Sequence, residues 1–319
     1  MSFDTNSFAS DGIILADRAL TRRAFLAGAL GLGATALLAG CGTGSSSSSS
    51  GSGSTITVGS KDFTENLILA ELYALALEDK GFKVKRSFNI SSSVTHTSLV
   101  SGDIDLYPEY TGTALISILK KDVETDPKKV YQTVKAAYKK KWNIDWLNYA
   151  QATDSQGLVI TTAASKKYGI TTISDLQKNA SKLRFASQGE FDKRADGIPA
   201  LEKAYGEFNW KSSKVYDNSL KYEILRKGQA DVTPAYTTEG QLASKTFTLL
   251  EDDKSVWPPY NVAPVVRGKV LKANPKIEDA LNAVSKTLTT AGLTKLNAQV
   301  DVKKKEYEDV AAAYFKKIK

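Results

Sequence analysis

The chain has 319 residues and a formal net charge of +8 at pH 7, with 43 Lys and Arg against 35 Asp and Glu. Its single Cys and single His exclude a disulfide framework, a cysteine-based metal site and a multi-histidine zinc site. From residue 56 onward the sequence also lacks the G-x-S-x-G, P-loop and G-x-G-x-x-G motifs, so we expect neither an enzyme nor a bound cofactor or metal.

The first 40 residues have the pattern of an export signal. Residues 21–26 read Thr-Arg-Arg-Ala-Phe-Leu, an apolar run of 16 residues occupies Ala24–Ala39, and residues 38–41 read Leu-Ala-Gly-Cys. The run is shorter than the roughly 20 residues that a membrane-spanning helix needs. The paired arginines resemble the twin-arginine class of signal peptide, and Leu-Ala-Gly-Cys resembles the lipobox of bacterial lipoproteins. We therefore expect a signal peptide over residues 1–40, cleavage before Cys41 and a diacylglycerol on the Cys41 sulfur.

A segment rich in Ser and Gly follows at residues 41–55. Such a composition cannot bury enough apolar surface to fold, so the segment is expected to be a flexible tether. A tether of this length has a typical reach of roughly 20 Å. The globular part then begins at Ile56 and is expected to lie outside the cytoplasm, anchored to the cell membrane.

Basic residues of the globular part occur in runs such as residues 139–141 and 303–305, which are all Lys and have no interleaved aromatic residues. We interpret these runs as solvated helix faces, with weak attraction to anionic lipid or to a partner as the alternative. Nucleic-acid binding is not expected, since no recognition motif accompanies the charge. His96 has no neighbours with catalytic or ligating spacing, so a surface or packing role is expected for it.

Strand and helix patterns alternate from Ile56 onward. Residues 56–60 read as a short strand, Thr64 is a candidate N-cap of the following helix, and that helix is expected to stop at Gly81. The apolar positions of the helix include Leu67, Ile68, Leu72 and Leu75. Residues 82–90 read as a second strand. Alternation of this kind indicates βαβ units and predicts a parallel sheet.

The sequence contains an internal echo. Residues 102–111 read GDIDLYPEYT and residues 228–237 read GQADVTPAYT, which match at five positions with one offset of 126. Upstream, residues 56–60 have a counterpart in residues 183–187, and a basic residue follows each, Lys61 in the first copy and Arg194 in the second. Coincidental loop chemistry is the alternative interpretation. The echo predicts two α/β lobes of similar plan, with a cleft between the carboxyl ends of their strands.

The predicted layout places lobe 1 at residues 56–152 plus 257–319 and lobe 2 at residues 153–256. Residues 257–260 read Trp-Pro-Pro-Tyr and would be the second crossover, because a pair of prolines continues neither a helix nor a central strand. Residues 275–319 show helical periodicity and would close lobe 1. The apolar positions are Leu281, Val284, Leu288, Val310 and Tyr314.

Three tyrosines fall in predicted loops of the cleft: Tyr110, Tyr236 and Tyr260. Aromatic rings from facing loops can surround a cation, each contact contributing about 0.5–2 kcal/mol. A quaternary ammonium suits such a site because it carries charge without a hydrogen to donate. For any one tyrosine, packing in the core with a bonded hydroxyl is the competing interpretation.

Polar groups for the other end of a zwitterion are also present. Lys61 and Arg194 could hold a carboxylate, Arg in bidentate fashion, and Thr113 could add a hydroxyl. Surface salt bridges are the alternative for Lys61 and Arg194.

Four blocks of the globular part read GSKDFTE (59–65), IDLYPEYTGT (104–113), EFDKRADG (190–197) and PPYNVAPVVR (258–267). Together they resemble the substrate-binding proteins of osmoprotectant ABC importers, the glycine betaine/carnitine/choline-binding lipoproteins. The resemblance implies a two-lobed type II periplasmic-binding-protein fold of the α/β class that closes around its ligand. It also implies roles for individual residues: Tyr110, Tyr236 and Tyr260 in an aromatic cage, Lys61, Thr113 and Arg194 at the ligand carboxylate, and Asp154 near the cation.

Two positions depart from this family pattern. Gln156 falls where a fourth cage residue is usually aromatic, and Asn66 stands where many members have Gln. A cage without one wall should bind a trimethylammonium group less tightly or accept a different cation.

The sequence thus predicts a monomeric binding protein that captures a quaternary-ammonium osmoprotectant such as glycine betaine. Its partners would be a membrane permease and a separate ATPase. Another betaine (carnitine, choline or ergothioneine), an exported lipoprotein enzyme acting on a choline-type substrate and a sensory receptor module are the alternatives.

Overall fold

The computed structural model describes residues 55–319. The predicted signal peptide, the lipidated Cys41 and all but the last residue of the tether lie outside the described residues, so these assignments stay predictions. Within residues 55–319, no helix is both long enough and apolar enough to cross a membrane.

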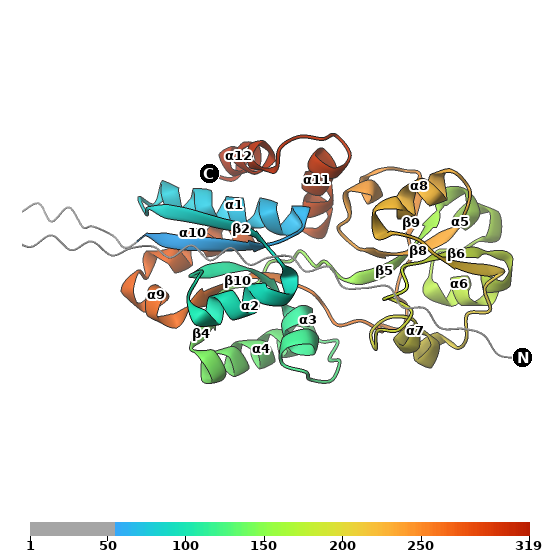
Figure 1. Ribbon diagram of the computed structural model, residues 1–319, viewed down its shortest axis with the longest axis horizontal. Helices are drawn as coiled ribbons and strands as arrows, with labels where there is room; N and C mark the ends of the chain where they lie inside the picture. Colours follow the sequence, from blue (N-terminus) through green and yellow to red (C-terminus); the bar gives the residue numbers. More distant parts are fainter. Residues whose placement is uncertain (1–54) are drawn as a thin grey trace, which may run out of the picture. The chain divides into compact units, whose positions relative to one another are not determined.

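The first sheet has five strands in the order β2-β1-β3-β10-β4 (Figure 1). Strands β1, β2 and β3 run parallel to one another, and β10 runs antiparallel to both of its neighbours. The strands are β1 (Ile56–Lys61), β2 (Val84–Ile90), β3 (Leu106–Tyr110), β4 (Ile144–Trp146) and β10 (Val262–Arg267). We call this sheet and the helices packed on it lobe 1.

The second sheet repeats this plan in the order β7-β6-β8-β5-β9. Strands β6, β7 and β8 are parallel, and β5 is antiparallel to β8 and β9. The strands are β5 (Gln156–Thr161), β6 (Arg184–Ser187), β7 (Ser212–Val215), β8 (Val232–Tyr236) and β9 (Phe247–Leu249). We call this sheet and its helices lobe 2.

Both sheets are mixed, which corrects the parallel sheet expected from the sequence. The reversed strand of each sheet, β5 or β10, is the first strand that the chain forms after it crosses from the other lobe. The chain enters a lobe from the side of the crossover, whereas the other strands of that sheet run toward it. Alternation of strands and helices along the chain does not reveal this reversal.

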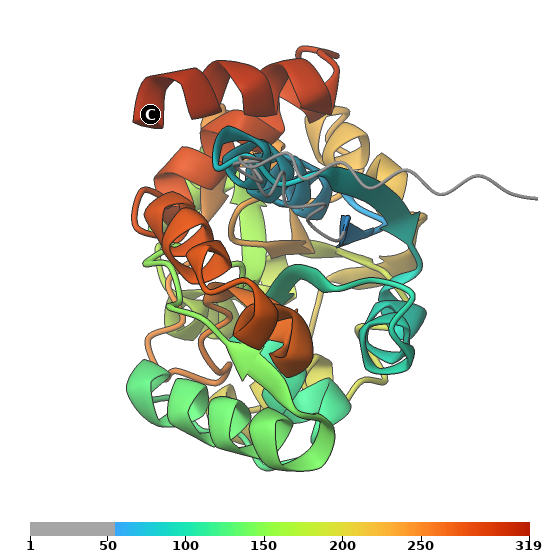
Figure 2. The same cartoon turned by 90° about the vertical axis from the view of Figure 1, so that its left-hand side faces the viewer.

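Helices cover both faces of the lobe 1 sheet (Figure 2), with α4 on one side and α1 and α12 on the other. The α-helices of this lobe are α1 (Thr64–Asp79), α2 (Ser92–Ser101), α3 (Thr111–Thr113), α4 (Pro127–Trp142), α9 (Gly268–Ala273), α10 (Lys276–Ser285), α11 (Thr290–Asp301) and α12 (Tyr307–Ile318), and a π-helical segment spans Ala114–Ile118. The predicted helical periodicity of residues 275–319 is confirmed by α10, α11 and α12.

Lobe 2 has shorter helices. They are α5 (Thr162–Tyr168), α6 (Ile173–Asn179), α7 (Ile198–Tyr205) and α8 (Lys221–Arg226), with 3-10 turns at Ala180–Lys182, Asn218–Leu220 and Gly240–Ala243. Helices α5, α6 and α7 pack on one face of the sheet and α8 on the other.

Each sheet separates two hydrophobic cores because successive side chains of a strand point to opposite faces. In β10, Val262 and Val266 belong to the core beneath α1, whereas Val265 belongs to the core beneath α4. In β5, Leu158 and Val159 divide between two cores in the same way. The alternation fixes which face of each sheet every strand presents.

The helix start at Thr64 differs from expectation. Phe63 occupies the N-cap position of α1, and the Thr64 hydroxyl donates to Asp301 Oδ1 at 2.6 Å instead of capping the helix. Helix α1 ends at Asp79, and Gly81 follows with φ +84°, a conformation that favours glycine. A short β strand at 84–90 replaces the expected 82–90.

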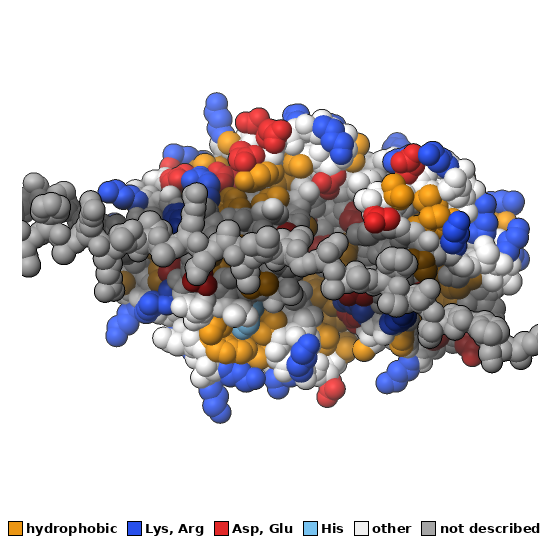
Figure 3. Space-filling view, in the orientation of Figure 1, with side chains coloured by type: hydrophobic (Ala, Val, Ile, Leu, Met, Phe, Trp, Pro, Cys, Tyr) orange, Lys and Arg blue, Asp and Glu red, His pale blue; other side chains and the backbone are white. Residues whose placement is uncertain are grey.

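Both lysine runs are solvated and His96 packs against aromatic side chains, but only one of the runs is helical. Residues 139–141 and 303–305 are exposed, and on the face shown in Figure 3 basic side chains are interspersed with acidic ones. The His96 ring packs edge-on against Tyr138 and Trp142, with ring centroids 5.1 Å and 4.5 Å apart. Residues 139–141 lie in α4, which confirms the solvated helix face predicted for that run, and the packing role of His96 is confirmed as well. The helical assignment of residues 303–305 is wrong, because this run lies in the connection between α11 and α12.

Candidate functional site

The matched residues of the two echo segments occupy equivalent positions in the two lobes. Asp105 Oδ2 accepts from the Thr57 amide at 2.9 Å, and Asp231 Oδ2 accepts from the Arg184 amide at the same distance. Each aspartate thereby joins the start of the central strand of its sheet, β3 or β8, to the start of the adjacent strand, β1 or β6. Gly102 and Gly228, each three residues before its aspartate, both have positive φ and end the preceding helical turn.

The threonines of the echo hold the two segments that pass between the lobes. Thr111 Oγ1 donates to the Pro259 carbonyl at 2.9 Å, and Thr237 Oγ1 donates to the Thr153 carbonyl at 3.1 Å. Each hydroxyl also accepts an amide of the same segment, from Asn261 or from residue 155. A backbone bridge between Thr153 and Asn261 joins the two passing segments. The loops after β3 and β8 are thus fixed to the crossovers.

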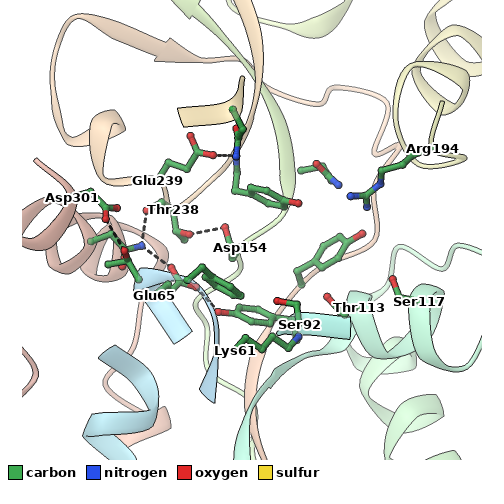
Figure 4. A pocket seen from close by; sticks show the side chains of 18 residues that line it. Lys61, Glu65, Ser92, Thr113, Ser117, Asp154, Arg194, Thr238, Glu239 and Asp301 are labelled. Atoms are coloured by element: carbon green, nitrogen blue, oxygen red, sulfur yellow. Dashed lines mark hydrogen bonds between the residues drawn. The ribbon is translucent and has the colours of Figure 1, made fainter. Parts of the chain in front are cut away.

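A cavity of about 460 Å³ lies at these strand ends, within the range of small-molecule sites. All eight ligand-binding residues predicted from the sequence line it: Lys61, Tyr110, Thr113, Asp154, Gln156, Arg194, Tyr236 and Tyr260. Figure 4 shows Arg194, Thr113 and Ser117 toward one end of the cavity and Glu65, Thr238 and Asp301 toward the other. The cavity is therefore polarised, with a basic end and an acidic end.

The three predicted cage tyrosines come from three different segments. Tyr110 ends β3 and is buried, Tyr236 ends β8 and is 39% exposed, and Tyr260 lies in the second crossover, where Gly112 packs beneath its ring. Burial raises the pKa of all three hydroxyls, and the charge of Asp154 raises each of them further. Asp154 is thus the acidic group that all three tyrosines share.

Each of the two strand-end tyrosines is supported by a buried ion pair. In lobe 1, Lys61 Nζ donates to Glu109 Oε1 at 2.5 Å, and the same oxygen accepts the Tyr110 amide at 2.8 Å. The Tyr107 hydroxyl donates to the other oxygen at 2.6 Å. Lys61 Nζ also lies 5.2 Å from the Tyr110 ring centroid. The positive charge predicted to meet a ligand carboxylate is therefore already compensated by Glu109.

Lobe 2 repeats this arrangement with residues that the sequence did not point out. Lys221 Nζ donates to Glu239 Oε1 at 2.5 Å, and that oxygen accepts the Tyr236 amide at 3.1 Å. The Tyr222 hydroxyl donates to Glu239 Oε2. Lys221, rather than Arg194, is the counterpart of Lys61. Because Lys221 precedes β8 whereas Lys61 ends β1, no common offset in the sequence links the two.

Arg194 stands in the loop between β6 and α7. Its Nε and Nη2 donate to the two carboxylate oxygens of Asp196 at 2.8 Å and 2.6 Å, which raises the pKa of the guanidinium. Nη1 has no partner among residues 55–319. The loop has a fixed shape, because the Trp257 indole donates to the Asp196 carbonyl at 2.7 Å and a Cβ on Gly197 would lie 1.9 Å from the Phe191 oxygen. The guanidinium is held in place with one free nitrogen.

The acidic end is built from α1, the first crossover and α11. Glu65 is 3% exposed and accepts from the Tyr110 hydroxyl at 3.0 Å and from Asn297 Nδ2 at 2.9 Å. Asp154 Oδ1 accepts from Thr238 Oγ1 at 2.6 Å. Burial raises the pKa of both carboxyl groups. Sequence reasoning missed Glu65 and Asn297, whose positions on helices give no signal that they meet at the cleft.

Gln156 starts β5, pairs with Tyr236 in the sheet and is buried. Its amide makes no hydrogen bond to any residue in the described part of the chain. A second cavity of about 160 Å³ adjoins this position and shares Arg194 and Asn218 with the first. Asn66, the other departure from the family pattern, lies behind the site, where it accepts the Lys61 amide at 2.7 Å and donates to the Pro108 carbonyl.

Comparison with known protein families gives one match that spans the described residues. Residues 54–317 match the family model described as the substrate binding domain of the ABC-type glycine betaine transport system. A solved structure described as a glycine betaine/carnitine/choline ABC transporter superposes with a TM-score of 0.77 at 28% identity, covering 82% of this chain and 98% of that one. The two-lobed periplasmic-binding-protein fold expected from the sequence is confirmed.

Two characterised relatives are similar over the same region. The chain is 28% identical over 267 residues to the carnitine transport binding protein of Listeria monocytogenes, covering 82% of this chain and 86% of that protein. It is 30% identical over 265 residues to the ergothioneine transport permease/ergothioneine binding protein of Helicobacter pylori. That match covers 82% of this chain but spans only 47% of the Helicobacter protein.

Proposed function

Because this chain belongs to the family of substrate-binding domains of ABC-type glycine betaine transport systems, we propose that it captures a quaternary-ammonium osmoprotectant such as glycine betaine and delivers it to the permease. The observation that carries the proposal is a single cavity walled by Tyr110, Tyr236 and Tyr260 and polarised between Arg194 and an acidic end. The rings would surround the trimethylammonium group. Capture involves no catalytic step, so the chain would not be an enzyme.

The basic end would bind the carboxylate of the ligand. Arg194 Nη1 is free to donate, and the Thr113 hydroxyl lines the same end. Lys61 would contribute to binding the same carboxylate; like Arg194, it is already paired with an acid, in this case Glu109. Asp154, which lines the cavity and whose charge raises the pKa of all three tyrosine hydroxyls, would face the cation.

Delivery requires the lobes to move relative to each other around the two crossovers. We place the lobe boundaries at residues 56–152 plus 257–319 and at residues 153–256, as the sequence predicts. The protein would act as a monomer, held at the outer face of the membrane through Cys41, and would present both closed lobes to a permease driven by a separate ATPase.

A second candidate ligand is a larger betaine such as carnitine or ergothioneine. The second cavity beside Gln156 and the unbonded amide of that residue favour it, because they offer space and hydrogen bonds beyond the three rings. Choline would lack the carboxylate that Arg194 is expected to meet. A Gln156→Tyr variant should close this space and shift selectivity toward glycine betaine.

A thermal-shift panel of glycine betaine, choline, carnitine, ergothioneine and proline tests the proposal, since a ligand that binds the folded state raises its melting temperature. We expect at least one quaternary ammonium to stabilise the protein and proline to have no effect. Tyr236→Ala should weaken binding about 2- to 30-fold, from the energy of one cation–π contact, and Tyr168→Ala, outside the cavity, should not. Stabilisation by none of the quaternary ammonium compounds would contradict the proposal.

A further inference from the structure

Glu65 and Asp154 stand at the acidic end of the cavity without a Lys or Arg partner in the described residues. Glu65 is almost fully buried, and Asp154 is half-buried and lines the cavity. A buried carboxylate without a compensating cation costs several kcal/mol relative to water. Two such groups in one site therefore need a source of positive charge.

Neutral donors supply part of the compensation. The Tyr110 hydroxyl and Asn297 Nδ2 donate to Glu65, Asn297 Nδ2 also donates to the Thr238 carbonyl at 2.8 Å, and the Thr238 hydroxyl donates to Asp154. This chain of hydrogen bonds runs from α1 of lobe 1 to the β8 loop of lobe 2. Asn297 Oδ1 is buried beside it without a partner within residues 55–319. These dipoles favour charge on the carboxylates but do not neutralise two of them.

The cations that line or adjoin the cavity are each matched by an acid of their own. The matched pairs are Lys61–Glu109, Lys221–Glu239 and Arg194–Asp196. Asp301 on α11 adds a further negative charge next to Glu65, with the Thr64 hydroxyl as its donor. The groups facing the pair from every neighbouring element thus leave Glu65 and Asp154 uncompensated when both are ionised.

We propose that Glu65 and Asp154 hold one proton between them in the free protein and release it to solvent when the cation of the ligand enters the cavity. The pair is then the counter-charge of the ligand, and Glu65 is a specificity residue beside Asp154. This inference rests on the proposed capture of a quaternary ammonium.

The affinity of the protein for its ligand should increase with pH. Burial raises the pKa of both carboxyl groups, and each charge raises the pKa of the other. A permanent cation lowers both values, so the ligand favours the doubly ionised pair. The affinity for glycine betaine should therefore increase with pH, by up to about tenfold per pH unit, while the free pair still holds its proton, and should level off once the free pair has lost it.

Calorimetric titration of the whole protein with glycine betaine, in two buffers of different ionisation enthalpy, counts the protons released. We expect between a half and one proton per ligand at the pH where the slope of affinity is steepest, and none in Asp154→Asn or Glu65→Gln. Both variants should also bind more weakly and without pH dependence. Glu223→Gln, which removes an exposed acid of α8, should behave as the wild type.

A measurement without ligand separates this inference from the proposed function. The infrared spectrum of the free wild-type protein at neutral pH should contain a protonated-carboxyl band that is absent from Asp154→Asn and Glu65→Gln. Binding of glycine betaine with no proton release, or a wild-type spectrum without the band, overturns the shared proton and leaves capture intact. Absence of binding together with the band contradicts capture and supports the shared proton.

Discussion

At the scale of single residues, the two lobes pair their charges around the cavity in the same way, and this pairing cannot be predicted from the sequence. The backbone amide of each strand-end tyrosine donates to a carboxylate that also accepts from a Lys and from a Tyr hydroxyl: the buried Glu109 in lobe 1 and the partly buried Glu239 in lobe 2. A buried ion pair of this kind tolerates loss of one partner poorly, because the remaining charge is left uncompensated. The arrangement holds the backbone of Tyr110 and Tyr236 in place before any ligand arrives.

His96 gives a residue-scale prediction about pH. Both of its ring nitrogens are buried without a partner in the described chain, and burial lowers the pKa of the ring below its ordinary value of 6.5, with Glu109 opposing and Lys61 reinforcing the shift. As pH falls below about 6.5, His96 becomes protonated in the unfolded chain but stays neutral in the folded protein. The free energy of unfolding therefore decreases. In the His96→Phe variant, the free energy of unfolding should fall less between neutral and acidic pH than in the wild type.

Urea unfolding of wild type and His96→Phe at about pH 7.5 and about pH 5.5 measures the effect. The variant should gain stability relative to the wild type at the lower pH. Equal losses in the two proteins would show that His96 does not titrate on unfolding in this range.

Much of the candidate site could be predicted from residue types and from the family resemblance. The three tyrosines and Arg194 are the aromatic and basic residues expected near the strand ends, and Asp154 follows from the family resemblance; all five line the cavity. The structure corrects one detail, because Tyr110 and Tyr236 are the last residues of β3 and β8 rather than loop residues.

Glu65, Asn297 and Lys221 could not be predicted in this way, because each lies on a helix and nothing in its local sequence indicates its partner. Glu65 and Asn297 meet only because α1 and α11, which are far apart in the sequence, pack in the same lobe.

At the scale of elements, the echo between residues 102–111 and 228–237 predicts the two similar sheets correctly. The echo does not predict the direction in which each strand runs. The reversed strands β5 and β10 follow crossovers, and the physical reason for the reversal is the side from which the chain enters each lobe. Directly after the echo the two copies differ, with Gly112 in the first and Thr238 at the same offset in the second.

A substitution at Gly112 tests whether the packing of Tyr260 matters for the proposed cage. A Cβ at this position would lie 2.8 Å from three atoms of the Tyr260 ring, so Gly112→Ala should displace the ring from the cavity wall. We expect about a tenfold loss of affinity for glycine betaine by calorimetry, equivalent to one displaced cation–π wall. Gly169→Ala is a control outside the cavity. Gly169 has φ +64°, and apart from its chain neighbours no residue of the described chain has an atom within 4 Å of an added Cβ. The substitution should therefore cost about 1 kcal/mol of stability and leave the affinity for glycine betaine unchanged.

At the scale of the whole molecule, α11 of lobe 1 contacts lobe 2 apart from the crossovers. Gly240 packs against the α11 backbone, where an added Cβ would lie 2.6 Å from the Ala298 amide nitrogen, and Asn297 donates to the Thr238 carbonyl beside it. Backbone on both sides leaves little room for adjustment. We infer that this contact limits how the two lobes approach each other.

Gly240→Ala should separate the contact and enlarge the molecule. X-ray scattering should give a larger radius of gyration for Gly240→Ala than for the wild type, both without ligand and with saturating glycine betaine. Gly228→Ala has positive φ but open space, so it should lose stability without changing the radius. An unchanged radius in Gly240→Ala would mean that α11 does not control the spacing of the lobes.

We propose that the cavity recognises a cation rather than a shape. Calorimetry with glycine betaine and with 3,3-dimethylbutanoate, an anion of the same shape in which an uncharged carbon replaces the ammonium nitrogen, distinguishes the two most directly. Three rings and the acidic end should favour the ammonium by more than about 1.4 kcal/mol, so glycine betaine should bind at least about tenfold more tightly. Equal affinities for the two compounds would show that the cavity recognises shape and not charge.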